Sequence, residues 1–511
     1  MRRPNAALVG LVVLLGCVTT PLPDRDWVEV RTPHFEIVSS LSANDTIDLA
    51  RNAELFHSAT EFVLGAAFPA PVVPTRIYAF DGRGFTRPFN RRGEPGYFLP
   101  SLRAAIIVLR TGDGWRLDAT ESLRHEYVHY LLGNHGGFER PLWFDEGSAE
   151  FLSTVEVKDG HVDLGRLRQD HVTLLRDQPW IPLIRILRAR DLEDWGKRKR
   201  SIFQAESWAF VHYLNFRRGE TGQGQAQLGR YFERIAEGVS HERAVEQAFG
   251  VSSSDLDGEL RRYVRSARFT SVAFRLRHSE AVDTSEMRPL ARDEVLTHLG
   301  WLSISLARAK QAQRYFERAV GDNPGNARAH AGLGAADALR GRWESAIPHY
   351  GRALEIAPGD PLTQVDVGTY YDGRARATGD AETRASFAAL ARRHYARSWE
   401  LGDPLPEAYA MYGATFLLEG EATERALEPL EEANRMLGSS LEIKLLLARL
   451  YSKLGRYRQA RAQVVAVFSR THSPLMRDRA RDLLARIDES LALRSIQRSA
   501  MSPGEAPARR R

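Results

Sequence analysis

Residues 123–132 read LRHEYVHYLL, and this stretch decides the fold that we expect for the first half of the chain. Asp118 and Glu121 just before it fit a capping box and Gly133 follows as a stop signal, so the sequence predicts a helix of about four turns. His125 and His129 then lie one turn apart on the same face of this helix. Two imidazoles so placed can bind one Zn²⁺, and Glu126 projects beside them, where a carboxylate can take a proton from zinc-bound water.

A second stretch, residues 140–151, reads RPLWFDEGSAEF and contains a third candidate ligand. Sixteen residues separate His129 from Glu146, and the glycine-rich loop of residues 133–138 is long enough to return the chain antiparallel to the first helix. Glu146 would then face the two histidines and leave one position of a tetrahedral ion open, as catalysis requires. Glu150, one turn further on, either orients a ligand or is an ordinary exposed acid of the helix.

Together the two stretches resemble the HExxH and W-L-N-E-G-x-A-E segments of gluzincin peptidases, most closely those of the peptidase-MA-like domains of bacterial lipoproteins. The resemblance is specific over residues 123–151 and extends in outline over roughly residues 27–265, within a predicted domain of residues 24–270. It implies an α+β, thermolysin-like metallopeptidase domain that holds one Zn²⁺ per chain. It also assigns the roles of the site, with zinc ligands His125, His129 and Glu146 and general base Glu126.

Three details separate the chain from the aminopeptidase branch of that clan. The stretch between the second and third ligands is sixteen residues long, shorter than in that branch, and Asp145 stands where Asn is usual. The G-x-M-E-N motif that anchors a substrate amino terminus is absent before the helix. We therefore expect an endopeptidase that acts on a peptide or protein substrate.

The residue that stabilises the transition state is not evident from these stretches. Residues 206–214 read ESWAFVHYL and predict a helix that packs near the site in folds of this kind. From there, Tyr213 or His212 could donate a hydrogen bond to a tetrahedral intermediate. The alternative is that this helix only packs in the core through its apolar residues.

The region before the first motif alternates strand-like and helical segments. We predict strands at residues 27–30, 34–38, 76–80 and 104–109, a helix at 44–64 and a loop at 82–96. From residue 117 to about 267 the pattern is mainly helical. A small sheet followed by helices is an α+β arrangement.

From about residue 293 the sequence repeats with a period of 34 residues. The first two copies agree at small, aromatic and proline positions: Leu299-Gly300 with Leu333-Gly334, Ala312 with Ala346, Phe316 with Tyr350, and Pro324 with Pro358. This pattern resembles the tetratricopeptide repeat, and five copies fit between residues 285 and 490. The resemblance implies an all-α solenoid whose concave face binds an extended or helical peptide of a protein partner.

The N-terminal residues 1–17 read MRRPNAALVGLVVLLGC, a basic start followed by an apolar run too short to span a membrane. Leu14-Leu15-Gly16-Cys17 resembles a bacterial lipobox, and Cys17 is the one cysteine of the chain. The resemblance implies lipidation of Cys17 and a membrane anchor in the bacterial cell envelope, with Val18 favouring the outer membrane facing the periplasm. The alternative is a plain signal peptide with an incidental cysteine. At the other end, residues 491–511 are predicted to form a disordered basic tail.

Composition limits the remaining function classes. The 511 residues carry 71 Lys and Arg against 65 Asp and Glu, and this net charge of +6 is too small and too dispersed to indicate a nucleic-acid partner. A single cysteine excludes Cys-rich metal sites. Two hypotheses remain: a lipid-anchored zinc peptidase whose repeats recruit substrate or partner, and a non-catalytic tetratricopeptide adaptor lipoprotein with a degenerate peptidase fold. The presence of Glu126 favours the enzyme, because a retired site can lose its base.

Overall fold

The computed structural model describes most of the chain between residues 22 and 501. The described residues are 22–64, 68, 72–82, 89, 96–111, 121–134, 140–158, 161–190, 192, 195–216, 223–266, 268–275, 287–402, 405–418, 424–471 and 473–501. The predicted signal peptide of residues 1–17, with Cys17, and residues 502–511 lie outside these ranges. Within the ranges, no helix has the length and apolar character that a membrane crossing requires.

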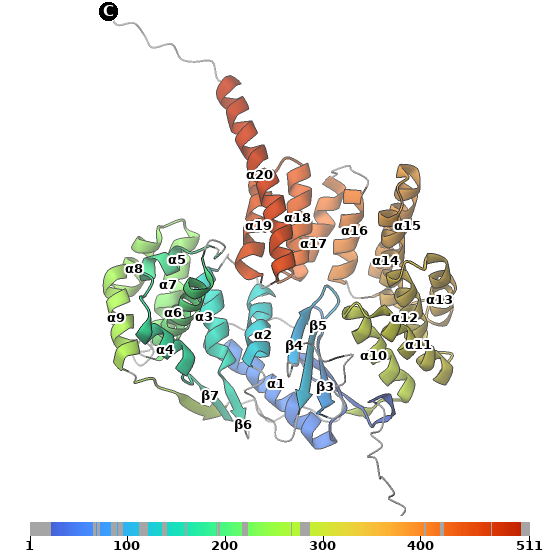
Figure 1. Cartoon of the computed structure of the whole chain (residues 1–511), viewed down its shortest axis with the longest axis horizontal. Coiled ribbons are helices and arrows are strands. Elements are labelled where there is room, and N and C mark those ends of the chain that lie inside the picture. Colours follow the sequence, from blue (N-terminus) through green and yellow to red (C-terminus); the bar gives the residue numbers. More distant parts are fainter. Residues whose placement is uncertain are drawn as a thin grey trace, which may run out of the picture.

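In the described part of the chain, the first half is built on a six-stranded mixed sheet with the order β4-β5-β3-β2-β1-β9 (Figure 1). Its strands are β1 (Val28–Arg31), β2 (Phe35–Ser39), β3 (Thr75–Asp81), β4 (Gly96–Pro100), β5 (Ala105–Thr111) and β9 (Arg288–Pro289). The central strands β2, β3 and β5 are parallel, whereas β4 pairs antiparallel with β5, and β1 with both β2 and β9. The helix α1 (Ala43–Leu64) connects the parallel strands β2 and β3.

Helices α2 to α9 follow the large sheet. They are α2 (Glu121–Asn134), α3 (Leu142–Ser153), α4 (Gln169–Asp177), α5 (Leu183–Arg188), α6 (Lys197–Phe216), α7 (Gly224–Ala236), α8 (His241–Phe249) and α9 (Ser253–Ser266). The strands β6 (Glu156–Lys158), β7 (His161–Leu164) and β8 (Val272–Arg275) form a small antiparallel sheet. The two motif helices α2 and α3 pack against each other, and α3 also packs against α6.

The second half is an array of helix pairs, as the repeat pattern predicts. Its helices are α10 (Arg292–Ser305), α11 (Ala309–Asp322), α12 (Ala327–Leu339), α13 (Trp343–Ile356), α14 (Pro361–Ala377), α15 (Ala381–Leu401), α16 (Pro406–Leu418), α17 (Leu427–Met436), α18 (Leu441–Lys453), α19 (Tyr457–Arg470) and α20 (Pro474–Met501). A Cβ on Gly300 would lie 2.4 Å from the ring of Phe316, and one on Gly334 would lie 2.8 Å from the ring of Tyr350. The small and aromatic residues of the repeat thus form the contact between paired helices, and the predicted helical solenoid is confirmed.

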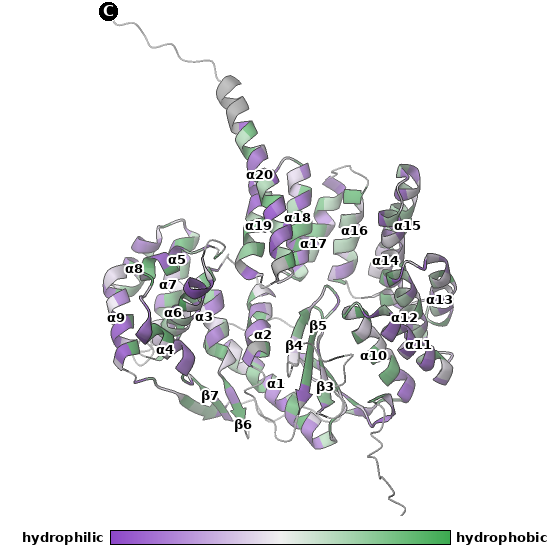
Figure 2. Ribbon diagram, viewed as in Figure 1, coloured by the Kyte–Doolittle hydropathy of each residue, from purple (hydrophilic) through white to green (hydrophobic). Residues whose placement is uncertain are grey.

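The large sheet is covered on both faces. In-register residues of β2, β3 and β5 form two rows: Ile37, Ile77 and Ile107 on one face, and Val38, Tyr78 and Val108 on the other. The first row packs in one core with α1 and α2, and the second row packs in another core with Leu299 of α10 and Phe316 of α11. Figure 2 shows β3 and β5 as mostly hydrophobic, as expected for enclosed strands. The first repeat is therefore a layer of the sheet domain.

The structure differs from the sequence prediction at three boundaries. β4 was not predicted, because its sequence GYFLP begins with Gly and ends with Pro and lacks a clear strand pattern. β9 lies inside the segment predicted as the array, yet its pairing with β1 places it in the large sheet, so the sheet domain does not end at residue 270. α20 continues to Met501, so residues 491–501 are helical rather than part of a disordered tail, since the Leu, Ala and Arg residues there are good helix formers.

We predict that a fragment of residues 24–270 does not fold stably, because it loses the cover over one face of the sheet. Burying a large apolar side chain contributes about 1.5–3 kcal/mol, so exposing Val38, Tyr78, Phe80, Ile106 and Val108 removes on the order of 10 kcal/mol, comparable to the whole stability of a domain. A fragment of residues 22–358 keeps the first two repeats and is the matched control. Thermal melts and binding of an apolar dye distinguish the two, and a cooperative melt without dye binding for residues 24–270 would contradict the prediction.

Candidate metal centre

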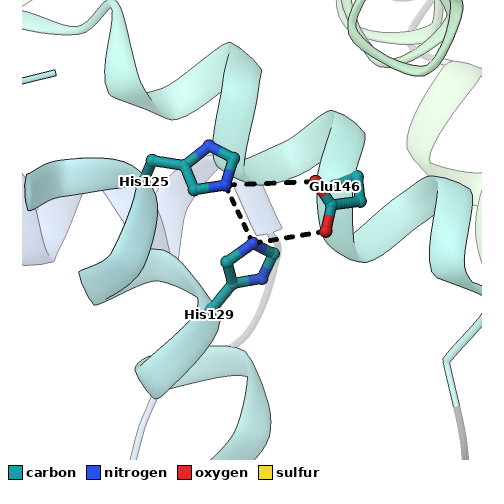
Figure 3. A group of neighbouring side chains, drawn as sticks. All are labelled: His125, His129 and Glu146. Atoms are coloured by element: carbon teal, nitrogen blue, oxygen red, sulfur yellow. Dashed lines mark hydrogen bonds and ion pairs between the residues drawn. The ribbon is translucent and has the colours of Figure 1, made fainter. Parts of the chain in front are cut away.

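The two motif helices bring three side chains together. His125 and His129 of α2 and Glu146 of α3 point toward a common centre (Figure 3). Nε2 of His125 lies 3.0 Å from Nε2 of His129. The nearest carboxylate oxygens of Glu146 lie 4.0 Å from Nε2 of His125 and 3.7 Å from Nε2 of His129. These are the three residues that the sequence singled out as ligands.

The separations suit a single tetrahedral metal ion. Ligand atoms about 2.0–2.2 Å from zinc at tetrahedral corners lie roughly 3.3–3.6 Å from one another. The observed separations of 3.0, 3.7 and 4.0 Å lie on both sides of that range. Glu146 is only 4% exposed, so its negative charge needs a nearby cation. Two imidazoles and a buried carboxylate therefore fit a zinc ion in both geometry and charge.

The helix α3, which carries Glu146, is buried along its whole length. Gly147 permits this, because a Cβ there would lie 2.5 Å from the backbone oxygen of Ser207 in α6. The glycine after the third ligand thus lets α3 and α6 approach backbone to backbone. Asp145 and Glu150 are buried with Glu146, so three carboxylates of one helix require partners.

Gln204 of α6 is a neighbour of Glu146 that the sequence analysis missed. Its Nε2 donates a hydrogen bond to Oε2 of Glu146 at 3.3 Å. Such a bond restrains the carboxylate in the position from which it faces the histidines. A single glutamine before the 206–214 stretch has no pattern that would have identified it.

Glu150 lies against His125. Its Oε1 is 3.6 Å from Nδ1 of His125, and its Oε2 is 3.0 Å from Nη1 of Arg168 and 3.3 Å from Nε2 of His171. Burial acts to raise the pKa of Glu150, but the contact with His171 and the charges of His125 and Arg168 outweigh burial and hold the pKa below its ordinary value. Glu150 is therefore a buried partner of His125 rather than an exposed acid of the helix.

Asp145, directly before the third ligand, is held by two arginines. Its carboxylate is buried and lies 3.2 Å from Nε of Arg140 and 3.6 Å from Nε of Arg470. Burial lowers the pKa of Arg140, and the charge of Arg470 adds to that effect, whereas Asp145 opposes it. Because Arg470 is the last residue of α19, the final repeat reaches the helix that carries Glu146. The two arginines give a physical reason for an acid at position 145.

The last repeats also contact the end of α2. The backbone N–H of Ser439, between α17 and α18, donates to Oδ1 of Asn134 at 2.8 Å. A Cβ on Gly133 would lie 2.8 Å from Cα of Ser439, so this approach requires a glycine. Ser439 and Asn134 are 305 residues apart in sequence, and no local pattern indicates that they meet.

Glu126 is half-buried on α2, one residue after His125. In an α-helix this places it next to the face that carries the two histidines. The predicted position of the general base beside the ligand pair is thus compatible with the helix that the structure has.

The polar atoms of His212 and Tyr213, the two candidate oxyanion stabilisers, have partners within the core. Burial lowers the pKa of His212 to about 4, so its ring is neutral at pH 7. Its Nε2 donates to the carbonyl oxygen of Gly165 at 3.1 Å, and its Nδ1 accepts from Oη of Tyr263 at 2.9 Å. Tyr213 donates to a carboxylate oxygen of Glu259 at 2.5 Å. The core-packing alternative describes this helix.

Comparison with known proteins identifies the repeats. Residues 304–364 match the family model described as tetratricopeptide repeat. No curated protein matches the chain. The family match lies within the array, where the helix pairs α11 to α14 carry the expected packing of small residues against aromatic rings.

Three solved structures illustrate the likeness of the array. The chain is similar to a thermophilic TPR protein of Thermus thermophilus, with 22% identity over 39% of this chain and 99% of that chain and a TM-score of 0.34. It is similar to PilF of Pseudomonas aeruginosa, with 17% identity over 42% of this chain and 93% of that chain and a TM-score of 0.32. It is also similar to yeast Tom70, with 16% identity over 59% of this chain and 62% of that chain and a TM-score of 0.31. At such low TM-scores these likenesses carry no argument about function.

We predict that Arg470→Ala weakens zinc binding by at most about 10-fold, the lower end of what losing a residue in contact with a ligand costs, because Arg470 pairs with Asp145, the neighbour of Glu146, and Arg140 still holds Asp145. Competition with a chromophoric chelator measures the zinc affinity of the full chain. Arg461→Ala is the matched control, since Arg461 lies on the same helix but pairs with Asp488 at 2.9 Å. An equal loss in both variants would show that only the stability of the array matters.

Proposed function

We propose that the chain is a zinc-dependent hydrolase of peptide bonds and that its repeats recruit the substrate or a partner. The observation that carries this proposal is the convergence of His125, His129 and Glu146, from two helices, at separations that suit one metal ion. Two histidines and one glutamate are a donor set of catalytic zinc sites, whereas structural sites use four protein ligands.

Each side chain of the site has one role in this proposal. His125, His129 and Glu146 hold the ion. When bound, zinc acts as a Lewis acid and lowers the pKa of water to about 7. Glu126 accepts the proton of the attacking water, and Glu150 keeps His125 oriented through its contact with Nδ1.

Two observations support a peptide as the substrate. The stretches at residues 123–132 and 140–151 resemble those of gluzincin peptidases, and the repeats are of a kind that makes contacts between proteins. The absence of the motif that anchors a substrate amino terminus supports cleavage within a chain rather than at its end.

The second candidate function is that of a tetratricopeptide adaptor without catalysis. The family match favours it more directly than the first, because residues 304–364 are matched as a protein-interaction repeat whereas the metal centre lies outside the match. In an adaptor, the buried cluster of His125, His129 and Glu146 holds a structural ion or none. The two candidates differ in one measurable property, which is hydrolysis that depends on Glu126.

We predict different outcomes for the three acids of the metal centre. Glu126→Gln keeps the shape but cannot accept a proton, so this variant retains zinc and loses hydrolysis by about 10²–10⁴-fold. Glu146→Ala removes one of three ligands, so both zinc binding and hydrolysis are lost. Glu150→Ala lowers zinc affinity by roughly 10–100-fold. Zinc content by elemental analysis and cleavage of a peptide library are measured on the full chain.

Glu233→Gln, an exposed acid of α7, is the control and should change neither property. Zinc bound by the wild-type chain together with equal hydrolysis by wild type and Glu126→Gln would favour the adaptor. Loss of zinc in Glu150→Ala but not in Glu146→Ala would mean that Glu150 is the third ligand.

We also propose that the protein is lipid-anchored in a bacterial cell envelope, with the outer membrane facing the periplasm as the favoured site. The support is the lipobox-like segment that ends at Cys17. More than one acyl chain makes a stable anchor without a membrane-spanning helix.

We predict that Cys17→Ser abolishes the lipid anchor, because a serine hydroxyl cannot form the thioether that carries the lipid. Mass spectrometry of the mature protein and partition into detergent measure this change in the host membrane. A Cys17→Ser variant that still carries lipid would show that the anchor is elsewhere.

A further inference from the structure

The turn between β4 and β5 enters the inner side of the repeat array. β4 ends at Pro100 and β5 begins at Ala105, and Figure 1 shows this hairpin beneath the arch of array helices. Oγ of Ser101 donates to the carbonyl oxygen of Ala104 at 2.8 Å and accepts from the backbone N–H groups of Arg103 and Ala104 at 3.3 and 3.1 Å. These bonds hold the turn in one shape and present Arg103 to the array.

Arg103 contacts the first helix of three repeats, which are the first, third and fourth of the array. Its Nη1 donates to Oδ1 of Asp366 in α14 at 2.8 Å, and its Nε donates to Oε2 of Glu407 in α16 at 2.7 Å. Its guanidinium also lies 5.5 Å from the ring centre of Trp301 in α10. Burial acts to lower the pKa of Arg103, but Asp366 and Glu407 outweigh it and raise the pKa above its ordinary value.

The shape of this contact selects a guanidinium. Arg103 uses two different nitrogens to bridge two carboxylates from different helices, which a planar group with fixed donors does and a single ammonium does not. Arg328 of α12 lies beside this contact. It donates to Oδ2 of Asp366 at 2.9 Å, and its guanidinium lies 4.5 Å from the ring centre of Trp301. Each oxygen of Asp366 is therefore occupied by a different arginine.

The charges of the contact require a cation from outside the array. The side chain of Asp366 is only 4% exposed, and Arg328 neutralises it in part. The ion pair of Glu407 in the described structure is the one with Arg103. Without Arg103, Asp366 would keep only the guanidinium of Arg328, which also pairs with Asp360 at 3.2 Å, and Glu407 would lose its ion pair.

We propose that the inner face of the array at α14 and α16 is an arginine-recognition surface and that its occupant in this chain is Arg103 of the β4–β5 turn. Through Arg103 the array binds the sheet domain of the same chain. A protein partner that uses the same surface must present an arginine and displace the turn. This inference does not depend on the metal centre.

Chemical rescue of Arg103→Ala in the full chain tests the proposal. We expect its melting temperature to fall by roughly 3–8 °C relative to the wild-type chain, because two carboxylates lose their shared cation. Millimolar methylguanidinium should restore at least half of this loss. Methylammonium at the same concentration should not, because it cannot bridge both carboxylates in the geometry of a guanidinium.

Two further variants locate the effect. Arg103→Ala combined with Glu407→Gln should lose the rescue by methylguanidinium, since one of the two bridged carboxylates is gone. Arg103→Lys should melt below the wild-type chain, because one ammonium replaces two fixed donors.

The proposal is overturned if Arg103→Lys is as stable as the wild-type chain, if methylammonium rescues Arg103→Ala as well as methylguanidinium does, or if Arg103→Ala melts at the wild-type temperature. Should Arg103→Ala fail to fold, its refolding yield with and without methylguanidinium provides the same readout. Equal yields in that experiment would also overturn the proposal.

Discussion

The burial of three carboxylates on α3 is the constraint on which the rest of the structure depends. A buried charge is costly unless a cation or a metal ion accompanies it. Each acid of α3 is therefore met by basic side chains: Asp145 by Arg140 and Arg470, Glu146 by His125 and His129, and Glu150 by Arg168 and His171. One short helix thus gathers α2, the start of α4 and the end of α19 around a candidate metal centre.

The repeat array packs against the sheet domain at several places along its length. Its first repeat covers one face of the sheet, its inner face holds Arg103, and its last repeats contact both helices that carry the candidate ligands. The hairpin that bears Arg103 also reaches α2, since Phe98 of β4 lies against Tyr130 with ring centres 6.0 Å apart. Residues of the array therefore take part in the contacts that border the candidate metal centre.

The family match and the metal geometry concern different residues. The match to tetratricopeptide repeats lies at residues 304–364 and suggests contacts with proteins, whereas the three candidate ligands lie between residues 125 and 146. A peptidase with a protein-binding array and an adaptor with a metal-binding core are both compatible with the family match. Hydrolysis dependent on Glu126 is the property that separates them, because zinc binding alone is compatible with both.

The sequence by itself was sufficient for two features that depend on local spacing, the histidine pair and the repeat. The positions i and i+4 placed His125 and His129 on one face, and the period of 34 residues predicted the helix pairs, because helical geometry is set within a few turns. Tertiary structure alone decided which distant groups meet, such as Arg470 with Asp145 and Arg103 with Asp366. The helix over residues 206–214 was predicted correctly, but the sequence did not show that its polar side chains, such as His212 and Tyr213, are buried in the core. Which face of a helix is buried, and which residues its side chains contact, depend on the packing of the whole chain. Local periodicity carries no information about these distant contacts.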